Sequence, residues 1–246
     1  MPTAAPSADV GGLDGALSFN FHALEIKIQP RGAGIVSMRY PGPLGHIELV
    51  DHPFPGFFAS FPELSCAPVS SDKNWPAFEA KHPSGLHIRK EFFFHHQASI
   101  NAMRVKISND GSAPLELPAW DLTLGPGMST VPSELKENAK NLMAVALVAP
   151  KKEGARDQFL ELKSEEEAAK GEGTWRWIGV MNRYFLAAAF PPYERFTGYR
   201  YGARTKTVPS TSWFGGKSTS KELAPWIVAE AAPLKLAPGE AVDFEI

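Results

Sequence analysis

Four histidines and one glutamate stand close together in the first half of the sequence. They are His82, His87, Glu91, His95 and His96. On an extended strand, His87, Glu91 and His95 would share one face, where an acid–base pair or a metal site is conceivable. A zinc ion, however, needs three or four converging ligands, and residues along one strand are spread over many ångströms. We therefore interpret them as histidines at a strand end near solvent.

The pattern S-x-x-K occurs three times, at Ser70–Lys73, Ser133–Lys136 and Ser218–Lys221. In penicillin-recognising enzymes the lysine lies one helical turn from a nucleophilic serine. Two of the three pairs fall in segments that read as loops, and the S-D-N and K-T-G partners of those enzymes do not occur. We interpret these residues as solvated polar groups.

The glycines of R-G-A-G, residues 31–34, follow a strand-like segment, as in a dinucleotide-binding fingerprint. No third glycine and no helix follow, so the segment is interpreted as a hairpin turn. The sequence also lacks a phosphate-binding P-loop, a G-x-S-x-G elbow and an H-E-x-x-H helix. We expect no catalytic residue, no cofactor and no metal.

Composition limits the class of protein. The 246 residues include 43% hydrophobic residues, enough for a large core, and the net charge is −2. Nucleic acid and anionic lipid are therefore not expected as main partners, because both require a basic face. The single cysteine, Cys66, excludes an internal disulfide. No stretch reaches the roughly 20 apolar residues of a membrane helix. Residues 1–16 are interpreted as a flexible linker or tail.

Short segments of alternating polarity, separated by glycine and proline, predict an antiparallel β-sandwich. Residues 24–30 and 35–40 predict one hairpin. Residues 85–96 and 100–107 predict a second hairpin. One face of its first strand carries Leu86, Ile88, Lys90, Phe92 and Phe94. Further strands are expected at residues 114–124, 141–149, 157–162, 197–208, 225–231, 233–237 and 242–246.

Two short peripheral helices are expected. Residues 133–143 could form one or two turns. Residues 164–171 have Ser164 as a possible N-cap, Glu167 three residues later and Gly171 as a stop, the pattern of a capping box. Because no repeat or domain-sized break in composition is found, residues 17–246 are expected to form a single domain.

The densest apolar run is WIGVMNRYFLAAAFPP, residues 177–192. It does not alternate, as a strand with one solvated face would. A lipid-dipping loop would typically place its aromatics next to lysines at a tip. We therefore expect two central strands buried on both faces, with Asn182 and Arg183 at the bend between them.

Two segments, residues 85–117 and 173–192, carry a recognisable set of residues. They are Gly85, Leu86, Ile88, Lys90, Phe92, Asn109, Pro114 and Leu115, then Trp177, Ile178, Gly179, Tyr184, Phe185, Leu186 and Pro191. In order and spacing they resemble the large periplasmic domain of the YidC membrane-protein insertases (the YidC/Oxa1/Alb3 family). The likeness extends from about Phe19 to Ile246.

The resemblance implies an all-β, galactose-mutarotase-like antiparallel β-supersandwich at the periplasmic face of the bacterial inner membrane. It implies a non-catalytic module that assists membrane protein insertion and folding with the Sec translocon. The implied partners are the SecD/SecF accessory subunits and nascent membrane proteins. The membrane helices of the family have no counterpart here, so membrane contact is expected only through segments absent from this chain. An excised domain and a free-standing relative both stay open.

Two alternatives follow from the same fold. A mutarotase-like sugar epimerase could use Glu91 or another carboxylate as base and His87 or His95 as acid, since ring opening needs two groups facing each other across a pocket. A carbohydrate-binding module would use aromatic rings as stacking platforms. The candidate platforms are Trp75, Tyr199, Tyr201 and Trp213.

Overall fold

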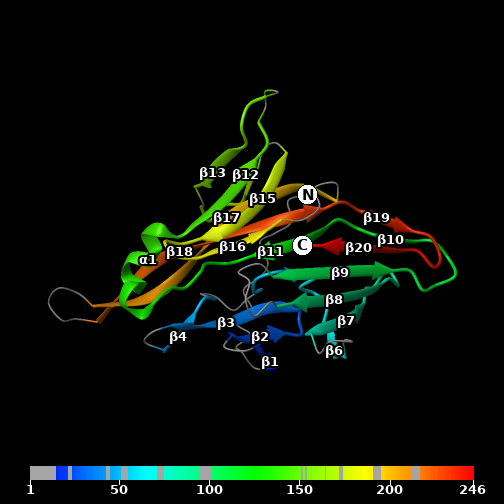
Figure 1. Cartoon of the computed structure of the whole chain (residues 1–246), viewed down its shortest axis with the longest axis horizontal. Helices are drawn as coiled ribbons and strands as arrows, with labels where there is room; N and C mark the ends of the chain where they lie inside the picture. The colour runs from blue at the N-terminus through cyan, green and yellow to red at the C-terminus, as the bar shows by residue number, and fades with distance from the viewer. Residues whose placement is uncertain are drawn as a thin grey trace.

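The computed structural model (Figure 1) describes residues 15–21, 24–42, 45–50, 55–70, 75–94, 101–150, 152, 154–163, 165–171, 174–190, 195–211 and 217–246. In these ranges the chain is an all-β, antiparallel β-supersandwich with one short helical segment. The expected fold class is confirmed.

The first four strands of the described residues form an antiparallel sheet. Its strands, in the order β1-β2-β3-β4, are Leu17–Phe21, Leu24–Gln29, Gly34–Gly42 and Gly45–Glu48. β2 and β3 form the first predicted hairpin, in which Ile26 pairs with Met38. The turn between them places Gly32 at φ +70°, a conformation that favours glycine.

The second sheet has five strands in the order β20-β9-β8-β7-β6. They are Ala241–Glu245, Ala102–Ser108, His87–Phe93, Ala77–Lys81 and Ala67–Val69. β8 and β9 pair as the second predicted hairpin. Along β8, Ile88, Lys90 and Phe92 are buried while the residues between them are half-buried, because a strand turns successive side chains to opposite faces.

The upper part of Figure 1 shows β13, β12, β15 and β17, which belong to two further sheets. One has the order β14-β17-β18-β11-β5, with strands Ala169–Lys170, Phe196–Thr211, Lys217–Ala231, Trp120–Leu124 and Ala59–Ser60. Another has the order β13-β12-β15-β16, with strands Gln158–Leu162, Met143–Val148, Trp175–Met181 and Leu186–Ala189. A two-stranded sheet pairs β10, Leu115–Leu117, with β19, Leu234–Leu236. β12 and β15 contact β18, so the two larger sheets pack together.

A single hydrophobic core connects the sheets. It includes Ile28 from β2, Phe78 from β7, Leu122 from β11, Ile178 from β15 and Phe244 from β20, each at most 1% exposed. Burial of this apolar area is the main force that holds the layers together.

One helix prediction is confirmed and the other is wrong. The 3₁₀ turn η1, Pro132–Glu134, leads into α1, Leu135–Asn141, as expected. Residues 165–171 form no helix, and Ser164 lies outside the described residues. Instead β14 pairs with β17, and the Ala203 backbone N–H donates to the Glu165 carbonyl oxygen at 2.6 Å. Pairing with β17 therefore overrides the local capping pattern.

The expectation that residues 177–192 form two strands buried on both faces is wrong for the second strand. β15 buries Ile178, Gly179 and Val180, but β16 lies at the sheet edge, and its Leu186 is 50% exposed. Tyr184 and Phe190, on either side of β16, are 48% and 64% exposed. Within the described ranges, no helix is both long and apolar enough to span a bilayer.

Candidate functional site

Two groups of residues are candidates for function: the residues of the family resemblance, and the histidine–glutamate group on β8. The first group begins with Gly85 in the β7–β8 turn. Gly85 has φ +97°, and a Cβ there would lie 3.2 Å from Leu115 Cδ1. Its N–H donates to the His82 carbonyl oxygen at 2.8 Å. Gly85 is therefore required by the turn, and its position indicates a structural role.

Lys90, on β8, points into the core and is only 2% exposed. Its Nζ donates to the Gly32 carbonyl oxygen and to Ser60 Oγ, each at 3.2 Å, and also to the Phe58 carbonyl oxygen. Burial lowers the pKa of Lys90 to about 7. The lysine thus joins β8 to the β2–β3 turn and to the segment around β5.

Asn109 follows β9 and is fully buried. Its Nδ2 donates to the carbonyl oxygens of Ala113 and Leu236, both at 2.9 Å, and its Oδ1 accepts from the Gly111 N–H. Its backbone N–H donates to the Glu240 carbonyl oxygen. One side chain therefore fixes the turn after β9 against the β19–β20 connection.

The W-I-G residues lie on β15. Ile178 is in the core, and Trp177 lies on the outer face with its ring 6.0 Å from those of Phe159 and Phe190. A Cβ on Gly179 would lie 2.6 Å from the Ala187 carbonyl oxygen. Glycine therefore permits the close approach of β16 to β15.

The turn from β15 to β16 is built on Asn182, which is 1% exposed. Its Oδ1 accepts from the N–H groups of Tyr184 and Phe185, both at 2.9 Å, and its Nδ2 donates to the Ser129 carbonyl oxygen at 2.8 Å. Asparagine is favoured here because its side chain bonds to the backbone two residues on. The sequence marked Asn182 as a bend but did not predict its partner Ser129.

The remaining motif residues are less buried. Phe185 packs against the core, whereas the Tyr184 hydroxyl donates to Glu134 Oε1 at 2.5 Å on the surface. Leu186 begins the edge strand β16. Pro191 lies outside the described residues. The structure thus brings Tyr184, Phe185 and Leu186 together at one hairpin and places Gly85, Lys90 and Asn109 elsewhere.

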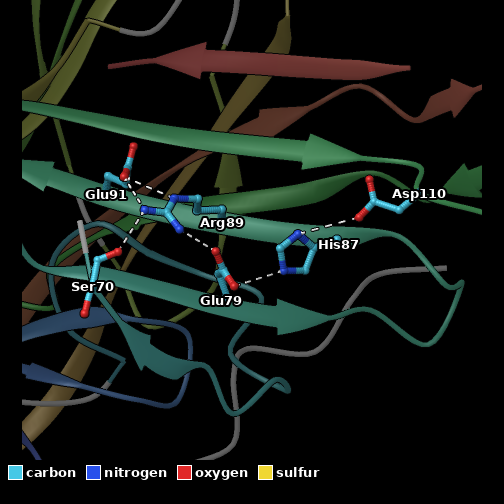
Figure 2. Close-up of polar contacts among 6 residues, drawn as sticks. All are labelled: Ser70, Glu79, His87, Arg89, Glu91 and Asp110. Atoms are coloured by element: carbon cyan, nitrogen blue, oxygen red, sulfur yellow. Dashed lines mark hydrogen bonds and ion pairs between the residues drawn. The ribbon is translucent and has the colours of Figure 1, made fainter. Parts of the chain in front are cut away.

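The second candidate is the polar network on the outer face of β7 and β8 (Figure 2). Arg89 donates to Glu79 Oε1 at 2.5 Å and to Glu91 Oε1 at 2.8 Å. His87 Nε2 lies 3.4 Å from Glu79 Oε2, and His87 Nδ1 lies 4.0 Å from Asp110 Oδ2. The hydrogen bonds to Glu91 and Glu79 raise the pKa of Arg89, so the guanidinium stays charged.

Glu91 and His87 do not face each other as the two groups of an acid–base site would. The Glu91 carboxylate accepts from Arg89, and His87 lies four residues away on the same strand, about 13 Å along it. A pocket of about 280 Å³ lies beside His87, and Glu91 is not among its described lining residues. The arrangement forms cross-strand ion pairs. His95 and His96 lie outside the described residues.

The structure describes three of the four aromatic residues proposed as sugar-stacking platforms. Tyr199 is 1% exposed, so it cannot be a stacking platform for a sugar. Tyr201 is half-buried, Trp75 stacks on Phe21 at 5.7 Å, and Trp213 lies outside the described residues. Among the described residues, no group of histidine, cysteine and acidic side chains has the arrangement of a metal site.

The architecture and these residues define a class of protein. It is a β-supersandwich domain in which the motif residues form turns and allow neighbouring strands to approach closely. The model of the YidC periplasmic domain family matches residues 69–228. The chain belongs to this family, and the resemblance found in the sequence is confirmed.

A curated relative supports the assignment. The chain is 30% identical over 162 residues to the membrane protein insertase YidC of Endomicrobium trichonymphae, and the match covers 65% of this chain. It covers 29% of the relative, so the chain spans less than a third of that protein's length.

Two solved structures are similar over most of the chain. A galactose mutarotase related enzyme from Lactobacillus acidophilus is 11% identical, with 94% of this chain and 96% of that chain covered and a TM-score of 0.48. A galactose mutarotase-like protein from Lactobacillus casei is 10% identical, with 94% and 98% covered and a TM-score of 0.47.

Proposed function

We propose that this domain is a non-catalytic interaction module of a YidC-type insertase. It acts at the periplasmic face of the bacterial inner membrane, where it assists insertion and folding of membrane proteins together with the Sec translocon. Its partners in this proposal are the periplasmic domains of SecD and SecF and nascent membrane proteins.

The observation that carries the proposal is the family match over residues 69–228, which includes the β8–β9 hairpin, the β15–β16 hairpin and most of β18. A sandwich of this kind offers rigid faces and exposed strand edges, and an extended segment can add to such an edge. The exposed apolar side chains beside β16 are suited to recognition of apolar polypeptide.

The geometry favours this function over sugar chemistry. Glu91, the proposed base of a mutarotase-like reaction, is held by Arg89, and His87 contacts Glu79 on the same surface. Tyr199, a proposed sugar platform, is in the core. Within the described residues, the contacts of Glu91, His87 and Tyr199 therefore give no support to an epimerase or a carbohydrate-binding module as a second candidate.

Purified periplasmic domains of SecD and SecF, immobilised separately, test the translocon contact. The 246-residue chain should be retained by at least one of them, while an unrelated periplasmic protein of similar net charge should pass through. Lack of retention by both at concentrations up to about 100 μM, a level that detects weak complexes, would reject the proposed translocon contact.

A further inference from the structure

We infer that the free edge of β16, together with the outer face of the β13-β12-β15-β16 sheet, binds an extended, uncharged apolar segment of a membrane protein. The segment adds as a strand beside β16. This inference rests on the proposed function and names the surface and the chemistry of the partner.

The outer face carries a row of three aromatic rings, the exposed Phe159 and Phe190 with the half-buried Trp177 between them, here called the aromatic row. Leu147 on β12 pairs with both Phe159 and Trp177, so the row crosses the sheet from β13 to β15. The Trp177 ring lies 6.0 Å from each of the other two rings. Phe159 is 47% exposed and Phe190 is 64% exposed. Aromatic rings dominate the energetics of interfaces when they are buried, so a partner that covers these two rings gains from their burial.

Leu186 extends this face to the sheet edge. A Cβ on Gly179 would lie 3.1 Å from Leu186 Cδ1, so Leu186 lies over Gly179. Gly179 shares a face with Trp177 because the two are separated by one residue on β15. The aromatic row and Leu186 therefore form one continuous apolar surface that ends at β16.

The free edge indicates an extended partner. In the described part of the chain, β15 is the one strand that pairs with β16. An edge strand presents unpaired N–H and C=O groups, and proteins usually protect such edges with charge or proline. β16 has the sequence Leu-Ala-Ala-Ala and carries no such residue, whereas the opposite edge strand, β13, carries Glu161.

The charges around the surface indicate an uncharged occupant. Arg183 at the β15–β16 turn is paired with Glu134 at 3.7 Å, and Arg176 is paired with Asp157 at 3.4 Å. Both cations are thus neutralised by this chain itself. An anionic headgroup would require unpaired cations, whereas an uncharged apolar segment of a membrane protein gains from burying the aromatic row.

The strand-addition mode can be tested with one peptide in two forms. The probe is a fluorescein-labelled peptide with an alternating leucine–valine core and two lysines at each end. The second form has the same sequence with alternate backbone amides N-methylated, which removes hydrogen-bond donors and keeps the apolar side chains. The unmodified form should bind the 246-residue chain, and the N-methylated form should bind at least about tenfold more weakly. Equal binding of the two forms would overturn strand addition.

Variants locate the binding surface. The double variant Phe190→Ser, Leu186→Lys should weaken binding of the unmodified peptide by about tenfold or more, because it removes apolar area and adds an edge charge. Tyr40→Ser is the matched control, since Tyr40 is 51% exposed on β3, in another sheet, and it should change binding less than twofold. Circular dichroism melting checks that both variants fold. Unchanged binding by the folded double variant would overturn the assignment.

Two further measurements separate this inference from the proposed function. If SecD or SecF domains retain the wild-type chain but the peptide does not bind, the inference fails and the proposed function stands. If neutral phosphatidylcholine vesicles bind through Phe190 and Leu186 and the peptide does not, the occupant is a lipid surface and the inference is again overturned. Peptide binding without SecD or SecF retention supports the inference and rejects only the translocon contact.

Discussion

Lys90 Nζ lies 3.2 Å from the carbonyl oxygen of Gly32, a residue 58 positions earlier in the chain. The bond links β8 to the β2–β3 turn, and the same Nζ also contacts the Phe58 carbonyl oxygen and Ser60 Oγ. A fully buried ammonium group is costly unless such acceptors surround it. The free energy of this contact therefore changes with the protonation state of one interior lysine.

Lys90 should make stability depend on pH. Burial lowers its folded pKa from 10.5 to about 7, so between these values the unfolded chain binds the proton more tightly. The contribution of Lys90 to stability should therefore rise as pH increases from 7 to 10, by on the order of 1 kcal/mol per pH unit, and fall as pH decreases towards 7. In urea unfolding, Lys90→Met should cost more stability at pH 9.5 than at pH 7.

Lys106→Met is the control for that experiment, because Lys106 lies on the exposed face of β9. Its stability difference from the wild type should be nearly the same at both pH values. A Lys90→Met difference that also stays constant with pH would contradict the assigned pKa.

Asn182→Ala should destabilise the β15–β16 turn. The change leaves the N–H groups of Tyr184 and Phe185 and the Ser129 carbonyl oxygen without their side-chain partner. We expect a loss of about 2–3 kcal/mol in the free energy of unfolding. Asn141→Ala removes one exposed hydrogen bond from α1 and should stay within about 0.5 kcal/mol. Equal losses for the two variants would show that Asn182 does not organise the turn.

Gly179→Ala should force β16 away from β15. The new methyl group would lie 2.6 Å from the Ala187 carbonyl oxygen, which is backbone and cannot move aside alone. A destabilisation of about 1–3 kcal/mol is expected in urea unfolding. In the control, Gly198→Ala, the atom nearest to the new methyl group is Glu230 Oε2, which is the end of a flexible side chain. A tolerated Gly179→Ala would disprove the close strand contact.

Sugar anomer exchange should not be accelerated by this chain. Proton NMR of freshly dissolved glucose should give the same exchange rate with and without protein, because Glu91 is engaged by Arg89 and does not face His87 across a pocket. The variants Glu91→Gln and His87→Ala serve as comparisons. Acceleration that either variant abolishes would favour the epimerase over an interaction module.

Local patterns were sufficient for much of the fold. The alternation along β8 correctly grouped Ile88, Lys90 and Phe92 on one face, and the structure shows that this face is the buried one. The polar segment around α1 was correctly interpreted as a short helix. These features depend on neighbours within a few residues, which a sequence displays directly.

The features that the sequence did not predict depend on long-range pairing. The capping-box pattern before Gly171 gave the wrong element because β17 provides backbone partners for that segment. The apolar composition of residues 184–190 did not distinguish a central strand from an edge strand, since that difference depends on sheet order. The acceptors of Lys90 come from two earlier segments whose approach no local pattern encodes.

The bonds of Asn109 have a consequence for biogenesis. Its side chain holds Leu236 and its backbone holds Glu240, and β20 pairs beside it with β9. During directional synthesis or export, the sheet of β6 to β9 therefore gains its edge strand β20, and Asn109 its partners, only when residues 234–246 emerge. Until then the outer edge of β9 has no strand beside it and is open to pairing with other chains, so these last strands complete the sheet and remove that aggregation risk.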